Sequence, residues 1–206
     1  MALLKVLLLL LGLGVSMNSD VSLQKRIIGG HNCGSLLSAE WILTAAHCWL
    51  GDKGRTMGAQ LGVHPRTRKW EDQKIEQGPV VYIDDKGQKH DIMLLKLKTS
   101  ANDFSRVKLP DCSIPPRKIQ LAGYASTDVD ENNVRGERND KLFLFYNINK
   151  YIHIFLQGDS GGGAVFNDMI YGVIVRGGKD YACLRPATMM DVCGYMEWIK
   201  QTTGLK

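Results

Sequence analysis

Short apolar runs rich in β-branched residues constrain the fold of this chain most strongly. Turn-forming stretches such as residues 84–87 and 176–178 separate the runs, and strands do not alternate with helical periods. This pattern is typical of an antiparallel all-β protein of the sandwich or barrel type. The strands that it predicts contain residues 41–44, 80–83, 92–95, 119–121 and 170–175.

The C-terminal end is the exception to this pattern. Between residues 190 and 201, apolar side chains recur mostly three and four positions apart, which predicts one amphipathic helix. A stripe of methionines and aromatic residues is expected of a packing surface rather than of a ligand site. The stripe consists of Met190, Cys193, Tyr195, Met196, Trp198 and Ile199.

The N-terminal residues carry two processing signals. Lys5 precedes an apolar run over residues 6–15, and small and polar residues follow, as in a secretory signal peptide. The alternative, an uncleaved membrane anchor, would need about 17–25 apolar residues. We therefore expect a signal peptide over residues 1–19 and a secreted, extracellular protein without a membrane partner. Residues 20–26 end in Lys25 and Arg26, directly before Ile27, which indicates a second cleavage site after Arg26.

Composition and charge exclude several classes of protein. The chain is 44% hydrophobic and 23% charged, which is typical of a globular protein and excludes a disordered one. The net charge of +5 is not gathered into a dense basic cluster, so we expect no nucleic-acid partner. The length of residues 27–206 suits one large domain or two small ones.

Three segments carry side chains suited to nucleophilic catalysis. His47 stands beside Cys48, Asp91 lies at the start of an apolar strand, and Ser160 lies within a glycine-rich turn over residues 158–162. A serine hydroxyl is a weak nucleophile near neutral pH, so a histidine must accept its proton as it attacks a carbonyl. A carboxylate must in turn fix the tautomer of the histidine and stabilise the imidazolium.

The order histidine, aspartate, serine, together with the sequence that begins at Ile27, resembles the trypsin/chymotrypsin family of serine endopeptidases. The resemblance implies an all-β fold of two packed antiparallel barrels with a C-terminal helix, in a protease domain over residues 27–206. It implies that Ser160 attacks, that His47 acts as general base and then acid, and that Asp91 orients His47. The backbone N–H groups of Gly158 and Ser160 would form the oxyanion hole.

The resemblance also implies activation by proteolysis. Cleavage after Arg26, at the end of an activation propeptide over residues 20–26, would free the ammonium group of Ile27 to pair with Asp159 beside the nucleophile. The partners implied are polypeptide substrates, an activating protease and protein protease inhibitors, for a protein that is itself a monomer. We expect no cofactor and no metal. Glu71, Asp72 and Glu76 are interpreted as solvated acidic residues, with a calcium loop as the alternative.

Five cysteines provide a second comparison with the family. The resemblance implies a bridge between Cys33 and Cys48, beside the histidine, and another between Cys112 and Cys193. Cys183 is left without a family partner because Leu156 stands where that partner would be.

Two segments depart from the family pattern. Only 20 positions separate Ile27 from His47, about half the family's usual spacing, so we expect the first barrel to lack its opening strands. Residues 139–156 contain nothing of the family pattern and resemble translated non-coding sequence, which suggests a retained intron. The alternative is a genuine lineage-specific β-hairpin.

The departures affect the expected specificity and activity. Ile154 falls at the floor of the primary pocket, with a far wall formed by Val175, Arg176, Gly177 and Ala187, so no acidic residue would receive Arg or Lys. We expect an active secreted endopeptidase. The alternatives are a catalytically impaired homologue that acts only by binding and the non-functional product of a broken gene.

Overall fold

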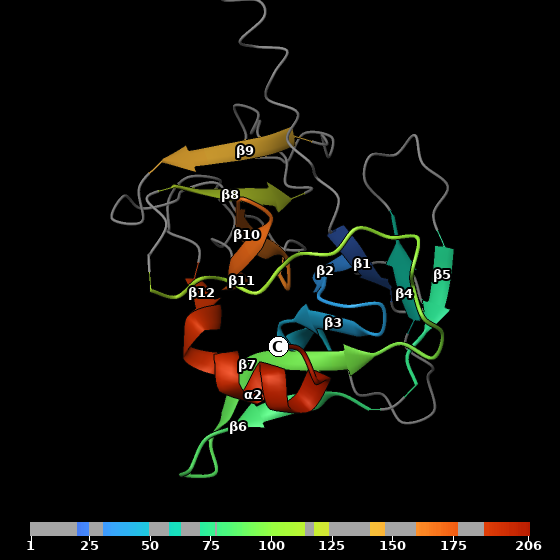
Figure 1. Cartoon of the computed structure of the whole chain (residues 1–206), viewed down its shortest axis with the longest axis horizontal. Coiled ribbons are helices and arrows are strands. Elements are labelled where there is room, and N and C mark those ends of the chain that lie inside the picture. The colour runs from blue at the N-terminus through green and yellow to red at the C-terminus, as the bar shows by residue number, and fades with distance from the viewer. Residues whose placement is uncertain are drawn as a thin grey trace, which may run out of the picture.

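The computed structural model describes nine segments of the chain (Figure 1). These are residues 20–24, 31–49, 58–62, 71–76, 78–113, 118–123, 141–146, 160–176 and 188–206.

A seven-stranded sheet contains most of the N-terminal half. Its strand order is β5-β4-β1-β2-β3-β7-β6, and neighbouring strands are antiparallel. The strands are β1 (Asp20–Gln24), β2 (His31–Leu36), β3 (Trp41–Thr44), β4 (Gly58–Leu61), β5 (Glu71–Lys74), β6 (Val80–Ile83) and β7 (Lys89–Lys96).

A five-stranded antiparallel sheet follows, in the order β12-β11-β10-β8-β9. Its strands are β8 (Lys118–Gly123), β9 (Lys141–Tyr146), β10 (Gly163–Phe166), β11 (Met169–Arg176) and β12 (Thr188–Asp191). The antiparallel all-β class is confirmed, and each of the five strands predicted from the sequence lies within an observed strand.

The predicted C-terminal helix is present but begins later than expected. Met190 is not helical: it lies in β12, opposite Val173 of β11. A short 3-10 helix, η2 (Val192–Tyr195), comes next and leads into α2 (Met196–Thr203). The Asp191 side chain accepts a hydrogen bond from the backbone N–H of Cys193 at 3.0 Å, and this cap marks where helical structure begins.

The N-terminal end of the first sheet differs from expectation. Residues 20–24, expected to belong to an activation propeptide, form β1 in the interior of the sheet, between β2 and β4. The sheet is therefore continuous where we expected the opening strands to be missing.

Part of the segment without family pattern is a regular strand. In β9, residues 141–146 pair with β8 from Lys118↔Tyr146 to Gly123↔Lys141. These six residues therefore form a strand beside β8, while the retained intron and the lineage-specific β-hairpin both stay predictions. Residues 139, 140 and 147–156 lie outside the described residues.

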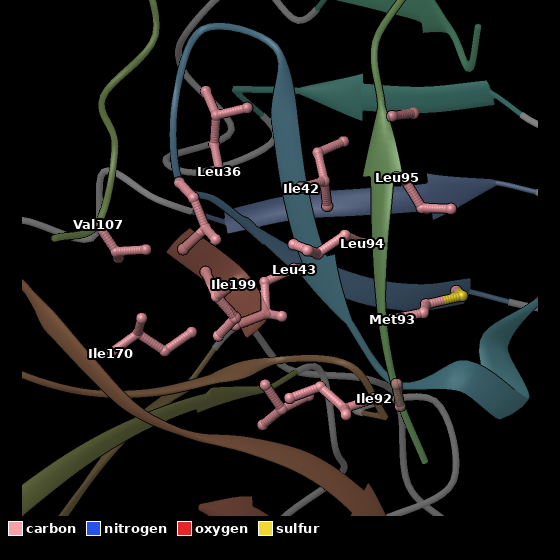
Figure 2. Packing of buried hydrophobic residues seen from close by; sticks show 14 of the residues in the cluster. Leu36, Ile42, Leu43, Ile92, Met93, Leu94, Leu95, Val107, Ile170 and Ile199 are labelled. Atoms are coloured by element: carbon pink, nitrogen blue, oxygen red, sulfur yellow. The ribbon is translucent and has the colours of Figure 1, made fainter. Parts of the chain in front are cut away.

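One apolar core joins the two sheets and the C-terminal helix. Figure 2 shows Leu43 of β3 and Ile92 of β7 beside Ile170 of β11 and Ile199 of α2, and all four side chains are buried. A disulfide between Cys112 and Cys193 also ties the connection between the sheets to η2, as the resemblance implied. Among the described residues, no helix has the length and apolar character needed to cross a bilayer.

Candidate active site

Strand pairing brings His47 and Asp91 together. β3 and β7 are antiparallel, with Thr44 opposite Met93. The chain leaving β3 therefore passes the residues that precede Met93 in β7. A 3-10 turn, η1 (Ala46–Cys48), places His47 at this point, and the buried side chains of Ala45 and Cys48 anchor the turn on either side.

His47 makes two hydrogen bonds to the Asp91 carboxylate. Its backbone N–H donates to Oδ1 at 2.8 Å, and its ring Nδ1 lies 2.7 Å from Oδ2. An ionised carboxylate only accepts hydrogen bonds, so Nδ1 carries the proton in this contact. Asp91 thus holds the ring in one orientation, with Nε2 as the nitrogen left to accept a proton.

The same contact shifts the pKa values of both groups. The hydrogen bond to Asp91, and after it the contact with the Cys48 sulfur, raise the pKa of His47 from 6.5 to about 10. Partial burial raises the pKa of Asp91, but the hydrogen bonds from His47 outweigh burial, so that pKa lies below its ordinary value. The pair is therefore ionised at neutral pH.

Ser160 lies in the turn that leads into β10. The next residue, Gly161, has a φ of 86°, in the left-handed region that glycine adopts readily, and its N–H donates to the Ile174 carbonyl at 2.6 Å. The Ile174 N–H donates in return to the Gly162 carbonyl at 2.9 Å. The Ser160 turn is thus fixed to β11 by two backbone hydrogen bonds.

The start of β10 approaches the first sheet closely at Gly163. A Cβ atom there would lie 2.5 Å from Ser35 Oγ of β2 and 3.0 Å from Ile170 Cδ1. Gly163 stands where the resembled family commonly has proline, and this approach explains why the smallest residue occupies the position here. It also places the start of β10, which follows the Ser160 turn, against β2 of the first sheet.

Within the described part of the chain, no hydrogen bond joins His47 to Ser160. The neighbour of His47 Nε2 is the Cys48 sulfur, at 3.9 Å. Contacts between nucleophile and base are often long in unliganded sites and shorten when substrate binds.

Several predicted site residues lie outside the described segments, namely Arg26, Ile27, Ile154, Gly158, Asp159, Gly177 and Ala187. Val175 is half-buried in β11, and Arg176 ends this strand opposite Thr188. The backbone of Cys33 lies in β2 opposite Ser22, and its bridge to Cys48 stays a prediction. Cys183 also lies outside the described segments.

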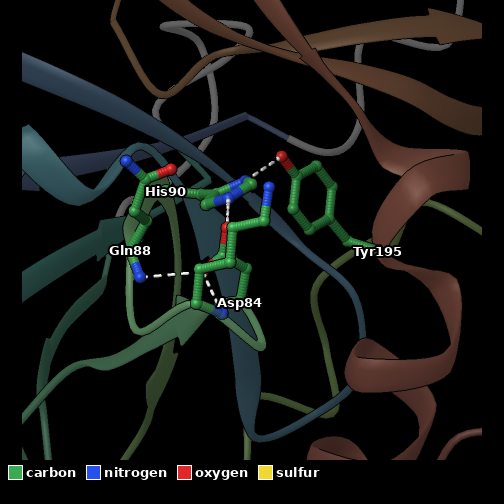
Figure 3. Close-up of polar contacts among 5 residues, drawn as sticks. Asp84, Gln88, His90 and Tyr195 are labelled. Atoms are coloured by element: carbon green, nitrogen blue, oxygen red, sulfur yellow. Dashed lines mark hydrogen bonds and ion pairs between the residues drawn. The ribbon is translucent and has the colours of Figure 1, made fainter.

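Sequence analysis missed a polar and aromatic cluster around His90, the residue before Asp91 in the chain. His90 Nδ1 lies 2.8 Å from the Tyr195 hydroxyl, and His90 Nε2 lies 3.4 Å from Asp84 Oδ2 (Figure 3). The Tyr82 ring contacts His90, Tyr195 and Trp198 edge to face. These residues are far apart in the chain, and the spacing of Tyr195 and Trp198 in the C-terminal stripe was the one local signal.

The acidic residues weighed for calcium are dispersed in the structure. Glu71 and Asp72 lie in β5, and Glu76 pairs with Lys96 at 3.2 Å. In the described segments, no three His, Cys, Asp or Glu side chains are grouped so that they could hold a metal ion.

Comparison with known proteins identifies the family to which the chain belongs. A family model described as Trypsin matches residues 15–199. Human kallikrein-8 is 26% identical over 97% of this chain and 94% of its own, and trypsin of Xenopus laevis is 26% identical over 96% and 97%. Cationic trypsin-3 of Rattus norvegicus is 30% identical over 85% of this chain and 81% of its own. The chain therefore belongs to the trypsin family of chymotrypsin-like serine proteases.

Proposed function

We propose that this protein is a secreted serine endopeptidase, made as a zymogen and activated by cleavage after Arg26. The observation that carries the proposal is the double contact of His47 with Asp91, at 2.8 and 2.7 Å. General-base catalysis needs the neutral ring with its proton on Nδ1, and the contact of Nδ1 with Asp91 favours that tautomer.

The site residues divide the steps of peptide-bond hydrolysis among them. Ser160 Oγ attacks the carbonyl carbon of the substrate while His47 Nε2 accepts its proton, and Asp91 stabilises the resulting imidazolium. The N–H groups of Gly158 and Ser160 bind the oxyanion, a contribution of about 3 kcal/mol per donor in such sites. His47 then protonates the leaving amine, and water hydrolyses the acyl-enzyme by the same steps.

Activation depends on the new N-terminus. Cleavage after Arg26 produces the ammonium group of Ile27, whose ion pair with Asp159 orders the turn that carries the oxyanion donors. The activating protease cleaves after a basic residue, because Lys25 and Arg26 end the propeptide.

The finer fold assignment belongs to the same proposal. We assign the seven-stranded and five-stranded sheets to the two barrels of the family. Support comes from the bridge Ile75↔Leu97 and the hydrogen bond from the Glu76 N–H to the Lys96 carbonyl at 2.8 Å, which join the end of β5 to the end of β7. A pocket formed by Ile154, Val175, Arg176, Gly177 and Ala187 would accept apolar side chains of polypeptide substrates.

Secretion is proposed from the N-terminal signal and from the Cys112–Cys193 disulfide. Such bridges persist in oxidising, extracellular surroundings. Protein protease inhibitors are further proposed partners.

Covalent labelling tests this function. The secreted protein is treated with a fluorophosphonate probe before and after cleavage at Arg26, with Ser160→Ala as the control. We expect labelling only after cleavage and none in the variant. A cooperatively melting protein that never labels would instead favour a homologue that acts by binding alone. Absence of a cooperative melt would indicate the product of a broken gene.

A further inference from the structure

Strand β7 contains a bulge at the point where it carries Asp91. The pairing of β6 with β7 is irregular there, and the pairs on either side are Val81↔Met93 and Ile83↔Lys89. Between these pairs, β6 has one residue, Tyr82, whereas β7 has three, residues 90–92. The ladder between β7 and β3 ends at Met93, so the three residues also extend beyond that ladder. Regular strand pairing therefore does not fix the backbone of Asp91, and β-bulges of this kind reorient side chains beside active sites.

The side chain of His90 holds this bulge through contacts at both ring nitrogens (Figure 3). Its Nδ1 lies 2.8 Å from the Tyr195 hydroxyl, and its Nε2 lies 3.4 Å from Asp84 Oδ2. The ring of Tyr82, the β6 residue opposite the bulge, contacts the His90 ring edge to face, with the centroids 5.1 Å apart. Side-chain contacts thus replace the strand pairing that the bulge lacks.

The charges of the cluster determine where its protons lie. Backbone N–H donation from Gln88 holds the pKa of Asp84 below its ordinary value, so the carboxylate is ionised near neutrality and only accepts hydrogen bonds. The Nε2 atom of His90 therefore carries a proton. Burial raises the pKa of the Tyr195 hydroxyl, so this group keeps its proton and donates it to Nδ1 of a neutral His90 ring.

Both partners of His90 are held in place by their own surroundings. The other carboxylate oxygen of Asp84 accepts two backbone N–H groups of its own turn, at 3.0 and 2.7 Å. Tyr195 ends η2, which the Cys112–Cys193 disulfide ties to the connection between the sheets. His90 therefore attaches the bulge to two fixed points, one in the β6–β7 turn and one in the C-terminal segment.

The orientation of Asp91 depends on this attachment. His90 and Asp91 share a peptide unit, so a movement of His90 changes the direction in which the Asp91 carboxylate projects. That carboxylate lies 2.7 Å from ring Nδ1 of His47. Groups that act in catalysis must be held within about 0.5 Å of their working geometry, usually by residues that do not themselves react.

We propose that His90 is a positioning residue that holds the bulge of β7 so that Asp91 can orient His47. It acts through its contacts with Asp84 and Tyr195. The effect on catalysis rests on the endopeptidase function proposed above, whereas the effect on the contact between His47 and Asp91 does not. The C-terminal segment thereby supports the site although it contains no catalytic residue.

NMR titration of the full-length, uncleaved protein tests the positioning. The hydrogen bond to Asp91 raises the pKa of His47 to about 10, so the titration midpoint of His47 reports on that contact. His90→Leu keeps a side chain of similar size without polar atoms and should lower this midpoint by about one pH unit or more. His90→Asn should restore most of the shift, because an amide group in the place of Nδ1 still accepts the Tyr195 hydroxyl proton. A midpoint in His90→Leu equal to that of the parent would overturn the proposal.

Ile199→Val is the matched control for a loss of stability. The Ile199 side chain is buried in α2, and shortening it should lower Tm by about 2–4 °C while the His90 contacts remain. The His47 midpoint of this variant should equal that of the parent. If His90→Leu does not fold, Tyr195→Phe removes the same hydrogen bond from the other side and should lower the midpoint by about half a pH unit. An equal fall in Ile199→Val and Tyr195→Phe would overturn the proposal, because it would show only an effect of stability.

Kinetics of the cleaved protein tests the role in catalysis. Displacement of Asp91 impairs the orientation of the base rather than the binding of substrate. His90→Leu should therefore lower kcat about tenfold and change KM by less than about twofold, and His90→Asn should recover most of kcat. An unchanged kcat with a lowered His47 midpoint would overturn the role in catalysis. If the parent neither labels with the fluorophosphonate probe nor cleaves substrate, the proposed function fails, and the titration of the uncleaved variants still decides whether His90 positions Asp91.

Discussion

His47 binds the carboxylate of Asp91 at both oxygens, through its backbone N–H at 2.8 Å and through ring Nδ1 at 2.7 Å. The backbone contact fixes where the residue sits, and the ring contact fixes which nitrogen carries the proton. Because β3 and β7 determine both positions, the pair is built into the first sheet and does not depend on substrate.

Asp91→Asn should lower kcat/KM by about 10⁴-fold while the protein still folds. An amide of the same shape can donate to Nδ1, which would favour the tautomer with its proton on Nε2 and remove the base. The measurement is kcat/KM on a peptide substrate of the cleaved protein, with Asp85→Asn, at an exposed turn residue, as the matched control. Activity near that of the parent would show that Asp91 does not orient the catalytic histidine.

The pH dependence of labelling should reflect the raised pKa of His47. General-base catalysis needs the neutral ring, and the pKa of about 10 keeps the ring protonated near neutrality. The rate of fluorophosphonate labelling should therefore increase from neutral pH towards about 10. In Asp91→Asn, NMR titration should show the His47 midpoint moving back towards 6.5. A parent midpoint at or below that ordinary value would contradict the assignment.

The same shifts set the sign of the effect of the pair on stability. The folded pKa of His47 is raised, so its contribution is complete below 6.5 and is lost as pH rises through about 10. The folded pKa of Asp91 is lowered, so its contribution is lost as pH falls below the ordinary value of 3.8. Both side chains are more than one-third exposed, so we expect an effect of about 1 kcal/mol or less.

Tyr195→Phe should weaken the attachment of the C-terminal segment to β7. The variant keeps the ring that contacts Tyr82 but loses the 2.8 Å contact with His90, at a cost of about 1 kcal/mol. Thermal unfolding should show Tm lowered by roughly 2–4 °C. Tyr171→Phe is the matched control, because the contact of the Tyr171 hydroxyl with the Met169 sulfur is long, at 4.0 Å. Equal Tm values for the two variants would show that the His90 contact adds no stability.

Sequence patterns predicted correctly those strands whose boundaries depend on residues adjacent in the chain. Residues 41–44 and 80–83 are strands with the predicted boundaries, because apolar runs and turn residues lie next to each other in the sequence. Met190 was assigned to the helix because its spacing fits, but pairing with Val173 of β11 outweighs that local period. β1 was not predicted because its assignment depends on partners in β2 and β4, which no local window contains.

In the site, likewise, sequence motifs identified some contacts, and contacts between distant residues without a motif were missed. The motifs around His47 and Asp91 identified two residues 44 positions apart that the structure brings into contact. The contact between His90 and Tyr195 spans 105 positions without a motif, and the spacing of Tyr195 in the C-terminal stripe did not identify its partner. The approach of Gly163 to Ser35 also joins two sheets, so no local pattern in the sequence predicts it.

Gly163→Ala should destabilise the protein through its contact with Ser35. The added Cβ would lie 2.5 Å from Ser35 Oγ. The Ser35 side chain or the strand that carries it must therefore shift, at a cost of about 1–3 kcal/mol. Ser35→Ala alone should be neutral or slightly stabilising, because Oγ is buried and has no hydrogen-bond partner among the described residues.

The double variant separates this contact from a general effect of the added methyl group. Removing Oγ clears the space that the Cβ needs, so Ser35→Ala should recover most of the stability lost in Gly163→Ala, with a coupling free energy of about 1–2 kcal/mol. Chemical denaturation of the parent, both single variants and the double variant measures this coupling. Strictly additive effects would mean that Ser35 Oγ does not limit position 163, and the close approach of β10 to β2 would then not explain the glycine. Recovery of stability would show that this contact sets how closely β10, which follows the Ser160 turn, approaches β2.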